Sequence, residues 1–484
     1  YITRTIQGEI TKIKEITYAE TTHRRGTSMT FVVGKGAEIE QSELPALEQL
    51  VSMGYQYISK NDLNKERKKT TEVLLYDRLQ QAITRINPEL DSDGVADALN
   101  QIREDSYPFS LDTMETNEKI RAKLVGLSQT GGLEPITVDQ IDESGVVKKT
   151  VKLFDFENID NNDFVVTNQF ELQGFKNPIY PDIILYVNGI PLVIIECKSP
   201  FIVQWLEEAV EQKNFKKYRS TGNGYERLMF YNHILIATNG DEARHGTISS
   251  DVNQFQNSRW SSAYPLTIDD VEKTYGKSRG QEILIAGMLQ KPHLLDLLKN
   301  YVIYQTIGNK RVKIMAKHQQ YRTVTKCAKQ IKTESTRRGG IIWHTQGSGK
   351  SYTMQWVAKQ AIEFGNLPIV IVTDRRQLDK QIHDTFSQAG FPDPIKIKKS
   401  TELGDFIRSP KGKTIMTTIQ KFEEIKDSTN EKIIVLVDEG HRSQYGTGAG
   451  SMDQSMPNGL YFGFTGTPID KGIKHSTYQV FGDP

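Results

Sequence analysis

An aspartate, a glutamate and a lysine are the residues whose types and spacing first point to catalysis. Asp182 begins the stretch DIILYVNGIPLVIIECK, and Glu196 and Lys198 end it. Residues two apart in a strand share a face, so Glu196 and Lys198 should lie together. Such a set suits a Mg²⁺-dependent nuclease, with Asp182, Glu196 and the Cys197 carbonyl binding the metal and Lys198 orienting water or neutralising phosphate charge. A surface ion pair between Glu196 and Lys198 is the alternative.

The turn between the two apolar runs tests this interpretation. Asn188–Gly189 is typical of a hairpin turn. A two-residue turn would pair Asp182 with Ile195 and place it on the wrong face. A three-residue loop, with Gly189 as a G1 bulge, would pair Asp182 with Ile194 and return it to the face of Glu196. The nuclease interpretation therefore predicts the bulged, three-residue hairpin.

A second candidate site is the glycine-rich stretch HTQGSGKS at residues 344–351, which lies between an apolar run and an amphipathic segment. That order of strand, glycine loop and helix is typical of a phosphate-binding loop, although ordinary tight connections also use it. Lys350 would reach the β- and γ-phosphates, and Ser351 would ligate Mg²⁺. Residue 344 is histidine where the strict pattern requires glycine, so only the shorter GxGK[ST] form is present. The residues expected to bind the nucleotide are Gly347, Ser348, Gly349, Lys350 and Ser351.

Polar clusters also follow the apolar runs after this loop. Asp438 and Glu439 follow the run Ile433–Val437, and the carboxyl ends of parallel strands form the edge where such sheets bind ligands. Asp438 would bind Mg²⁺ and Glu439 would orient the hydrolytic water. The alternative for such acids is helix capping.

Charge and cysteine content exclude some classes of protein. The 61 Lys and Arg residues balance 60 Asp and Glu residues, so nucleic-acid contacts must come from local patches. Cys197 and Cys327 lie far apart without CxxC spacing, which argues against a disulfide framework or a structural zinc site and favours the cytoplasm. No apolar run approaches the ~20 residues that a membrane span needs, so no membrane partner is expected, and no secretory signal stands at Tyr1.

The length of 484 residues predicts about two to four domains. The fold class expected is α/β, with a mixed-sheet nuclease domain followed by a RecA-like domain built on a parallel sheet. Helices are expected over residues 40–55, 71–86, 205–219, 293–304 and 313–331. The expected organisation is a peripheral hairpin or arm (1–36), the nuclease domain (37–255), a connector (256–310) and the RecA-like domain (311–484).

Five motifs occur in order in the second half: HTQGSGKS, VTDRRQLDKQI, TTIQKF, VDEGHRSQYG and GFTGTP. They resemble motifs I, Ia, Ib or its neighbour, II and III of superfamily 2 helicase-like translocases. Together with the block PDIILYVNGIPLVIIECKSP upstream, the sequence resembles the restriction and motor (R) subunit of type I restriction-modification systems, in which a PD-(D/E)xK nuclease is fused to such a motor.

The resemblance implies an ATP- and Mg²⁺-dependent enzyme that translocates double-stranded DNA and cuts unmethylated foreign DNA. Methyltransferase (M) and specificity (S) subunits would be its partners. Gln320 would hold the adenine, and Thr465 and Thr467 would couple the nucleotide state to DNA movement. The resemblance assigns ATP hydrolysis to Lys350, Ser351, Asp438 and Glu439, and cleavage to Asp182, Glu196 and Lys198.

Further nuclease residues are implied less directly. The family has a glutamine–tyrosine pair with QxxxY spacing, for which Gln212 and Tyr218 are candidates at a longer spacing. A helix glutamate often joins such metal sites, and Glu40 or Glu43 could fill that role.

The sequence ends shortly after motif III, so a second RecA-like domain with an arginine finger is expected to be missing from it. Because that finger stabilises transition-state charge, these residues alone should bind ATP but hydrolyse it poorly. Two alternatives remain: a superfamily 2 motor with a decayed nuclease, and an ATP-gated DNA-binding or assembly module that does not cut.

Overall fold

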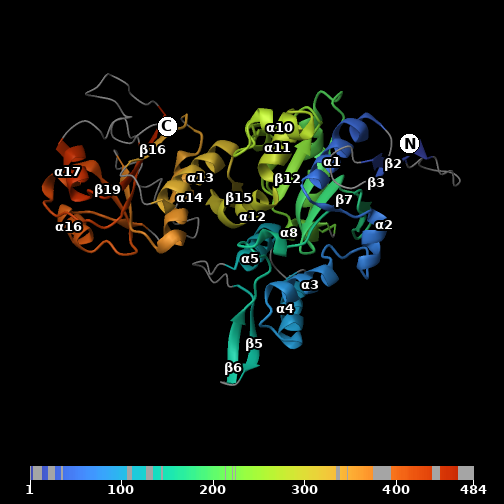
Figure 1. The fold of residues 1–484 in the computed structure, drawn as a ribbon, viewed down its shortest axis with the longest axis horizontal. Coiled ribbons are helices and arrows are strands. Elements are labelled where there is room, and N and C mark those ends of the chain that lie inside the picture. The colour runs from blue at the N-terminus through green and yellow to red at the C-terminus, as the bar shows by residue number, and fades with distance from the viewer. Residues whose placement is uncertain are drawn as a thin grey trace. The chain divides into compact units, whose positions relative to one another are not determined.

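The computed structural model of this chain falls into two compact units (Figure 1). The N-terminal unit comprises Tyr1–Val302 and Ile307–His318, and the C-terminal unit comprises Ile303–Thr306 and Gln319–Pro484. The structure describes residues 2–3, 14–19, 28–33, 36–105, 112–126, 135–142, 145–212, 214–220, 222–223, 225–333, 338–345, 347–373, 394–438 and 447–466. Each unit contains its own six-stranded sheet. The chain therefore has the α/β fold class that the sequence predicted.

The N-terminal unit is built on a mixed sheet with strand order β13-β12-β11-β10-β7-β4. In that order the strands are Ala243–Gly246, Ile234–Thr238, Ile190–Cys197, Ile183–Val187, Phe164–Asn168 and Gln56–Tyr57. β11 runs parallel to β12 and β4 runs parallel to β7, whereas the other neighbours are antiparallel. Every residue of β10 and β11 is buried, which explains why both strands read as continuous apolar runs.

The helical segments before the central strands differ from the expected ones mainly at their N-terminal ends. The helix expected over residues 40–55 begins with one π-helical turn, η1, and the helix expected over residues 71–86 begins only at Tyr76. In chain order these segments are η1 (Ile39–Glu43), α1 (Leu44–Ser52), α2 (Lys60–Leu63), η2 (Asn64–Glu66), α3 (Tyr76–Ile86), α4 (Ser92–Asp105), α5 (Thr113–Val125) and η3 (Ile159–Asn161).

Three small antiparallel sheets accompany the main one. β1 (Ile2–Thr3), β2 (Lys14–Ala19) and β3 (Ser28–Val33) form the first, where the sequence predicts a peripheral hairpin or arm. The second is the hairpin of β5 (Thr137–Asp142) and β6 (Gly145–Thr150), which extends away from the main sheet beside α4 (Figure 1). The third pairs β8 (Leu172–Gln173) with β9 (Pro178–Ile179).

The helix expected over residues 205–219 consists of three short segments. They are α6 (Trp205–Glu207), the π-helical turn η4 (Glu208–Gln212) and α7 (Asn214–Arg219). A π-helical turn adds a residue to the helix and rotates every later side chain about its axis. Sequence periodicity therefore does not give the faces of α7. The helices α8 (Glu226–Tyr231) and α9 (Val252–Gln256) follow.

A connector was expected over residues 256–310. The part of it up to residue 302 belongs to the N-terminal unit and forms three helices. These are α10 (Ile268–Tyr275), α11 (Gly280–Met288) and α12 (Lys291–Asn300). Every residue of α11 is buried. The boundary between the units falls in the following stretch, which contains β14 (Val302–Ile307) and β15 (Lys310–Met315).

The C-terminal unit contains a sheet whose strands all run parallel, with order β16-β21-β20-β17-β19-β18. In that order the strands are Arg338–Trp343, Leu460–Thr465, Ile434–Asp438, Ile369–Thr373, Thr414–Thr418 and Ile395–Lys396. The helices are α13 (His318–Lys332), α14 (Lys350–Gly365), α16 (Ser400–Arg408), η5 (Ile419–Glu424) and α17 (Thr447–Ser455). The polar clusters predicted at the ends of apolar runs therefore do follow parallel strands.

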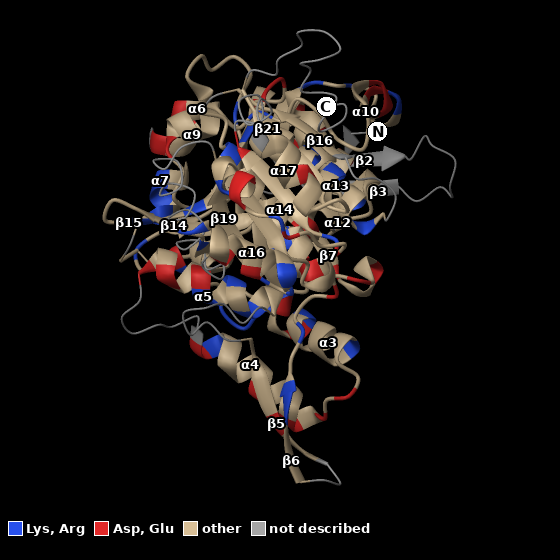
Figure 2. Cartoon of the chain, turned by 90° about the vertical axis from the view of Figure 1, so that its left-hand side faces the viewer, with Lys and Arg blue, Asp and Glu red and all other residues tan. Residues whose placement is uncertain are grey.

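Charges of both signs are interspersed along helices such as α4 and α5 (Figure 2), in keeping with the overall balance of charge. Among the residues that the structure describes, no helix has the length and apolar character needed to cross a membrane.

Candidate active sites

The turn that leads to the candidate nuclease site has two residues. Val187 pairs with Ile190. Asn188 and Gly189 between them have φ values of +51° and +77°, as a two-residue type I′ turn requires. The prediction of a three-residue loop with a bulge at Gly189 is therefore wrong, because an Asn-Gly pair satisfies the shorter turn without strain.

A bulge nevertheless shifts the register further along β11. Leu185 pairs with Val193 whereas Tyr186 pairs with Pro191, which leaves Leu192 as an extra residue. Proline has no N–H to donate to a neighbouring strand, so inside sheets it is found mostly at edges and bulges. Pro191 was the sequence signal for the true position of the bulge.

Asp182, Glu196 and Lys198 come together at the end of β11. Beyond the bulge Ile183 pairs with Ile195, so the register continued by one residue sets Asp182 across from Glu196. Lys198 Nζ lies 3.8 Å from Asp182 Oδ2 and 3.9 Å from Glu196 Oε2. All three residues are buried, and Glu196 has no exposed surface. The structure therefore unites the three residues that spacing singled out, in a buried cluster instead of a surface ion pair.

The peptide groups of Cys197 lie inside this cluster. The Cys197 N–H donates to Asp182 Oδ2 at 2.7 Å, and the Cys197 carbonyl accepts from Lys198 Nζ at 2.7 Å. The strand end is fixed from the other side, because the Lys198 backbone N–H donates to the Thr238 carbonyl of β12 at 2.7 Å.

Burial and mutual repulsion set the protonation of these groups. Burial raises the pKa of Glu196 well above its usual range, and the negative charge of Asp182 raises it further, while Lys198 opposes both. Burial alone would lower the pKa of Lys198, but Asp182 and Glu196 outweigh it and leave the pKa raised. The Lys198 ammonium group therefore stays charged between two buried carboxyl groups, and the pKa of Glu196 shows that its neutral form is favoured.

The same oxygen atoms are of the kind that binds a divalent cation. Glu196 Oε1 is buried and has no hydrogen-bond partner within the described part of the chain, although such atoms are normally satisfied. Carboxylate and carbonyl oxygens are the ligands that Mg²⁺ prefers. No group of three or more His, Cys, Asp or Glu side chains among the described residues is arranged to hold a metal, so Asp182 and Glu196 would need the Cys197 carbonyl as a third ligand.

The structure distinguishes the two helix glutamates. Glu40 is exposed, whereas Glu43 at the end of η1 is buried and accepts hydrogen bonds from Asn168 Nδ2 at 2.8 Å and Gln169 Nε2 at 3.2 Å. Gln169 Nε2 also donates to Asp182 Oδ1 at 2.9 Å, so one amide bridges both carboxyl groups. Burial, followed by the charge of Asp182, raises the pKa of Glu43 to about 7.

A second pair of side chains reaches the site from α7. Asn214 Nδ2 donates to Glu196 Oε2. The pKa of the Tyr218 hydroxyl is raised well above its usual range by burial and by its contact with Glu196. Asn214 and Tyr218 are four residues apart, which is the QxxxY spacing with asparagine replacing glutamine. The side chain of Gln212 lies outside the described atoms. Asn214 was not predicted, because the family pattern has glutamine at that position, and no sequence pattern pointed to Asn168 or Gln169.

The glycine-rich loop in the C-terminal unit joins β16 to α14. Gly347 and Gly349 have φ values of +79° and +83°, which favour glycine over other residues. Lys350 Nζ lies 3.4 Å from the His344 carbonyl and donates to it, and Lys350 is the first residue of α14. Ser351 follows it in the first turn of that helix. The expected order of strand, glycine loop and helix is confirmed.

The side chain of Gln320 in α13 contacts the backbone of this loop. Its Nε2 donates to the carbonyls of Ser348 at 3.2 Å and Gly349 at 3.1 Å. A Cβ at residue 349 would lie 2.7 Å from Gln320 Nε2. The His344 ring, at the position of the missing glycine, is 3.2 Å from the Thr323 hydroxyl of α13 through Nε2. The structure thus brings Gln320 to the predicted nucleotide site, where it braces the loop.

Thr465 and Asp438, two other residues that the sequence singled out, lie along the same edge of the parallel sheet. The His344 N–H donates to the Thr465 carbonyl at 3.1 Å. Asp438 ends β20 and is buried. β21, which ends at Thr465, separates β20 from the strand that leads into the loop. The glycine loop after β16, Thr465 at the end of β21 and Asp438 at the end of β20 therefore follow one another across three adjacent strands. Glu439 and Thr467 lie outside the described residues.

Two family models match separate parts of the chain. Residues 37–254 match the model described as "Type I restriction enzyme R protein N terminus", and this range contains the carboxylate cluster. Residues 319–484 match the model described as "SWI2/SNF2 ATPase", and this range contains the glycine loop.

Known proteins align with most of the chain. A protein of Methanocaldococcus jannaschii named as the MjaIXP endonuclease subunit of a type I restriction enzyme is 32% identical over 91% of this chain and 43% of its own length. The HindI endonuclease subunit of Haemophilus influenzae, also named for a type I restriction enzyme, is 31% identical over 90% of this chain and 43% of its own. The chain thus spans less than half the length of these relatives. The helicase domain of Pyrococcus furiosus Hef covers 34% of this chain and 35% of its own, with 19% identity and a TM-score of 0.27, too low to support a conclusion.

Proposed function

We propose, on the basis that this chain belongs to the family of type I restriction enzyme endonuclease subunits, that it cleaves DNA with its N-terminal unit and hydrolyses ATP with its C-terminal unit. Cleavage would depend on Mg²⁺, and ATP hydrolysis would drive translocation along double-stranded DNA. The observation that carries the nuclease proposal is the meeting of Asp182, Glu196 and Lys198 around the Cys197 carbonyl.

The carboxylate cluster supplies groups suited to phosphodiester hydrolysis. Asp182, Glu196 and the Cys197 carbonyl would hold Mg²⁺, which supplies Lewis acidity and an activated water when bound. Lys198 would neutralise charge that develops on the scissile phosphate, because its ammonium group already lies at the same oxygens. Asn214 would orient Glu196, and Gln169 would orient Glu43 and Asp182 by donating a hydrogen bond to each.

The glycine loop supplies groups suited to ATP hydrolysis. Backbone N–H groups of Gly347, Ser348 and Gly349 would face the phosphates at the start of α14. Lys350 would bind the β- and γ-phosphates, while Ser351 and Asp438 would hold Mg²⁺. Glu439 would orient the attacking water. Gln320 would contribute to nucleotide binding by fixing the loop that it contacts, with a direct contact to adenine as the alternative role.

The proposed substrate is unmethylated foreign DNA, and the proposed partners are methyltransferase and specificity subunits of the same system. Phosphate contacts from Lys and Arg would be independent of sequence, so these partners would supply recognition. We propose a cytoplasmic location, since both cysteines are free, buried thiols.

The test uses the full-length subunit assembled with its partners, on unmethylated circular DNA with Mg²⁺ and ATP. Cutting and ATP hydrolysis are measured together for the wild type, Lys198→Ala, Lys350→Ala and Lys216→Ala. Lys216 is an exposed lysine of α7 and serves as the matched control. We expect Lys198→Ala to abolish cutting while hydrolysis persists, and Lys350→Ala to abolish hydrolysis.

Persistent cutting by Lys198→Ala would mean that the nuclease site is elsewhere or absent. This outcome would favour the alternative function, a superfamily 2 motor or an ATP-gated DNA-binding module without an active nuclease. Loss of both activities in Lys198→Ala, with Lys216→Ala normal, would show that Lys198 supports the structure instead of the chemistry.

A further inference from the structure

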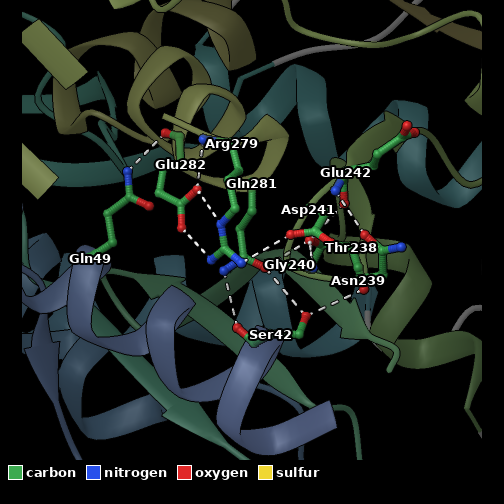
Figure 3. A network of polar contacts seen from close by, with 10 residues as sticks. All are labelled: Ser42, Gln49, Thr238, Asn239, Gly240, Asp241, Glu242, Arg279, Gln281 and Glu282. Atoms are coloured by element: carbon green, nitrogen blue, oxygen red, sulfur yellow. Dashed lines mark hydrogen bonds and ion pairs between the residues drawn. The ribbon is translucent and has the colours of Figure 1, made fainter. Parts of the chain in front are cut away.

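One buried glutamine of α11 joins two segments of the N-terminal unit that both lead to the carboxylate cluster (Figure 3). Gln281 has no exposed surface. Its Oε1 lies 2.7 Å from the Thr238 hydroxyl and 3.3 Å from the Ser42 hydroxyl, and its Nε2 donates to the Ser42 carbonyl at 3.1 Å. A single side-chain amide therefore holds η1 and the end of β12 together.

The first segment carries Glu43. Ser42 is the residue before Glu43 in η1, and both its hydroxyl and its carbonyl contact the Gln281 amide. The Ser42 hydroxyl is also within 3.4 Å of the Thr238 carbonyl, to which it donates. Because Ser42 directly precedes Glu43, a tertiary anchor at Ser42 restricts where Glu43 points.

The second segment holds the end of β11. Cys197 pairs with Thr238 in the parallel register, and the Thr238 carbonyl accepts the backbone N–H of Lys198. The Thr238 hydroxyl accepts from the Gly240 N–H at 3.1 Å and lies within hydrogen-bond distance of Gln281. The peptide that carries Lys198 is thus bonded to Thr238, and the Thr238 side chain is in turn bonded to Gln281.

We propose that Gln281 is a positioning residue for the nuclease centre, acting through Ser42 on Glu43 and through Thr238 on Lys198. The proposal rests on the function proposed above. Gln281 lies beyond residues 37–254, which match the restriction-enzyme family model. The nuclease centre therefore draws on α11, which lies in the stretch predicted to be a connector.

A matched control exists on the neighbouring helix. Gln49 of α1 is also a buried glutamine, and its Nε2 donates to the Glu282 carbonyl of α11 at 2.9 Å (Figure 3). It links α1 to the residue next to Gln281 but contacts neither Ser42 nor Thr238 in the described network. Gln49→Met and Gln281→Met make the same chemical change, so their comparison separates positioning of the site from general packing against α11.

The experiment measures three quantities in the assembled enzyme: DNA cutting, ATP hydrolysis and, without added metal, hydrogen–deuterium exchange of the peptide spanning residues 193–199. We expect Gln281→Met to slow cutting roughly tenfold, the lower end for partners that orient metal-binding groups. Exchange of that peptide should become faster, because the Lys198 N–H bond to β12 is loosened, and ATP hydrolysis should persist. Gln49→Met should match the wild type in all three measurements.

Wild-type cutting and exchange in Gln281→Met would overturn the proposal, as would equal losses in both glutamine variants. Ser42→Ala, a smaller change, is the second variant in case Gln281→Met does not fold, and the proposal fails if it leaves cutting and exchange unchanged. Lys198→Ala separates the two hypotheses: if that variant cuts, the nuclease assignment is wrong, whereas if only Gln281→Met cuts normally, the positioning role alone is wrong.

Discussion

Replacing Glu43 by glutamine should remove a pH dependence of stability that the buried carboxyl group creates. Burial and the nearby Asp182 raise the pKa of Glu43 from its ordinary value of 4.5 to about 7 in the folded chain. The difference of about 2.5 between the two values, at ~1.36 kcal/mol per pKa unit, amounts to about 3 kcal/mol. Glutamine has nearly the same shape and carries no charge at any pH.

The sign follows from which state binds the proton more tightly. Between pH 4.5 and pH 7 the folded chain keeps the Glu43 proton while the unfolded chain has lost it, so stability falls as pH rises. The contribution is fully present below pH 4.5 and is lost as the pH passes through about 7. Relative to wild type, Glu43→Gln should therefore gain about 3 kcal/mol in unfolding free energy between pH 4.5 and pH 8.

The assay is urea denaturation of the metal-free protein across this pH range, read as the difference between variant and wild type. Any constant offset from new hydrogen bonds to Asn168 or Gln169 cancels in the pH dependence. Glu40→Gln, on the exposed part of the same turn, is the control and should follow the wild type. Added Mg²⁺ should stabilise the wild type more at pH 8 than at pH 5, because it favours the charged carboxylate. A difference between Glu43→Gln and wild type that does not vary with pH would refute the reasoning.

Three further predictions concern the turn, the motor and the nuclease site. Gly189→Ala should destabilise the protein by about 2 kcal/mol or more, because residue 189 has a φ of +77° and a Cβ there would lie 2.4 Å from the Leu75 carbonyl oxygen. Thermal denaturation measures this loss, and an unchanged melting temperature would contradict the prediction. Gln320→Ala should weaken binding of ATP and GTP alike in equilibrium titrations, because the side chain contacts loop backbone; loss of ATP preference alone would indicate an adenine contact. Asn214→Ala should slow cutting by the assembled enzyme roughly tenfold, whereas Lys216→Ala should not, and equal rates would exclude an orienting role for Asn214.

The sequence by itself determined the two candidate sites and the kind of sheet that supports each. Glu196 and Lys198 share a face because side chains alternate along any strand. The succession of β16, glycine loop and α14 could be predicted because each of the three has a local signal in the sequence. These signals are an apolar run, two glycines that tolerate positive φ, and a helical pattern. These features depend on neighbours within a few residues, and local chemistry is what a single sequence displays.

Only the tertiary structure decided which further residues join the nuclease site. The choice of Glu43 over Glu40 depends on packing between distant segments, because Asn168 and Gln169 bind Glu43. The approach of Asn214 to Glu196 follows a π-helical turn that shifts the helix face. The packing of Gln281 against Ser42 joins residues far apart in the chain. Such contacts are specified by shape and by the need to pair every buried polar group, and this information becomes available only when the chain has folded.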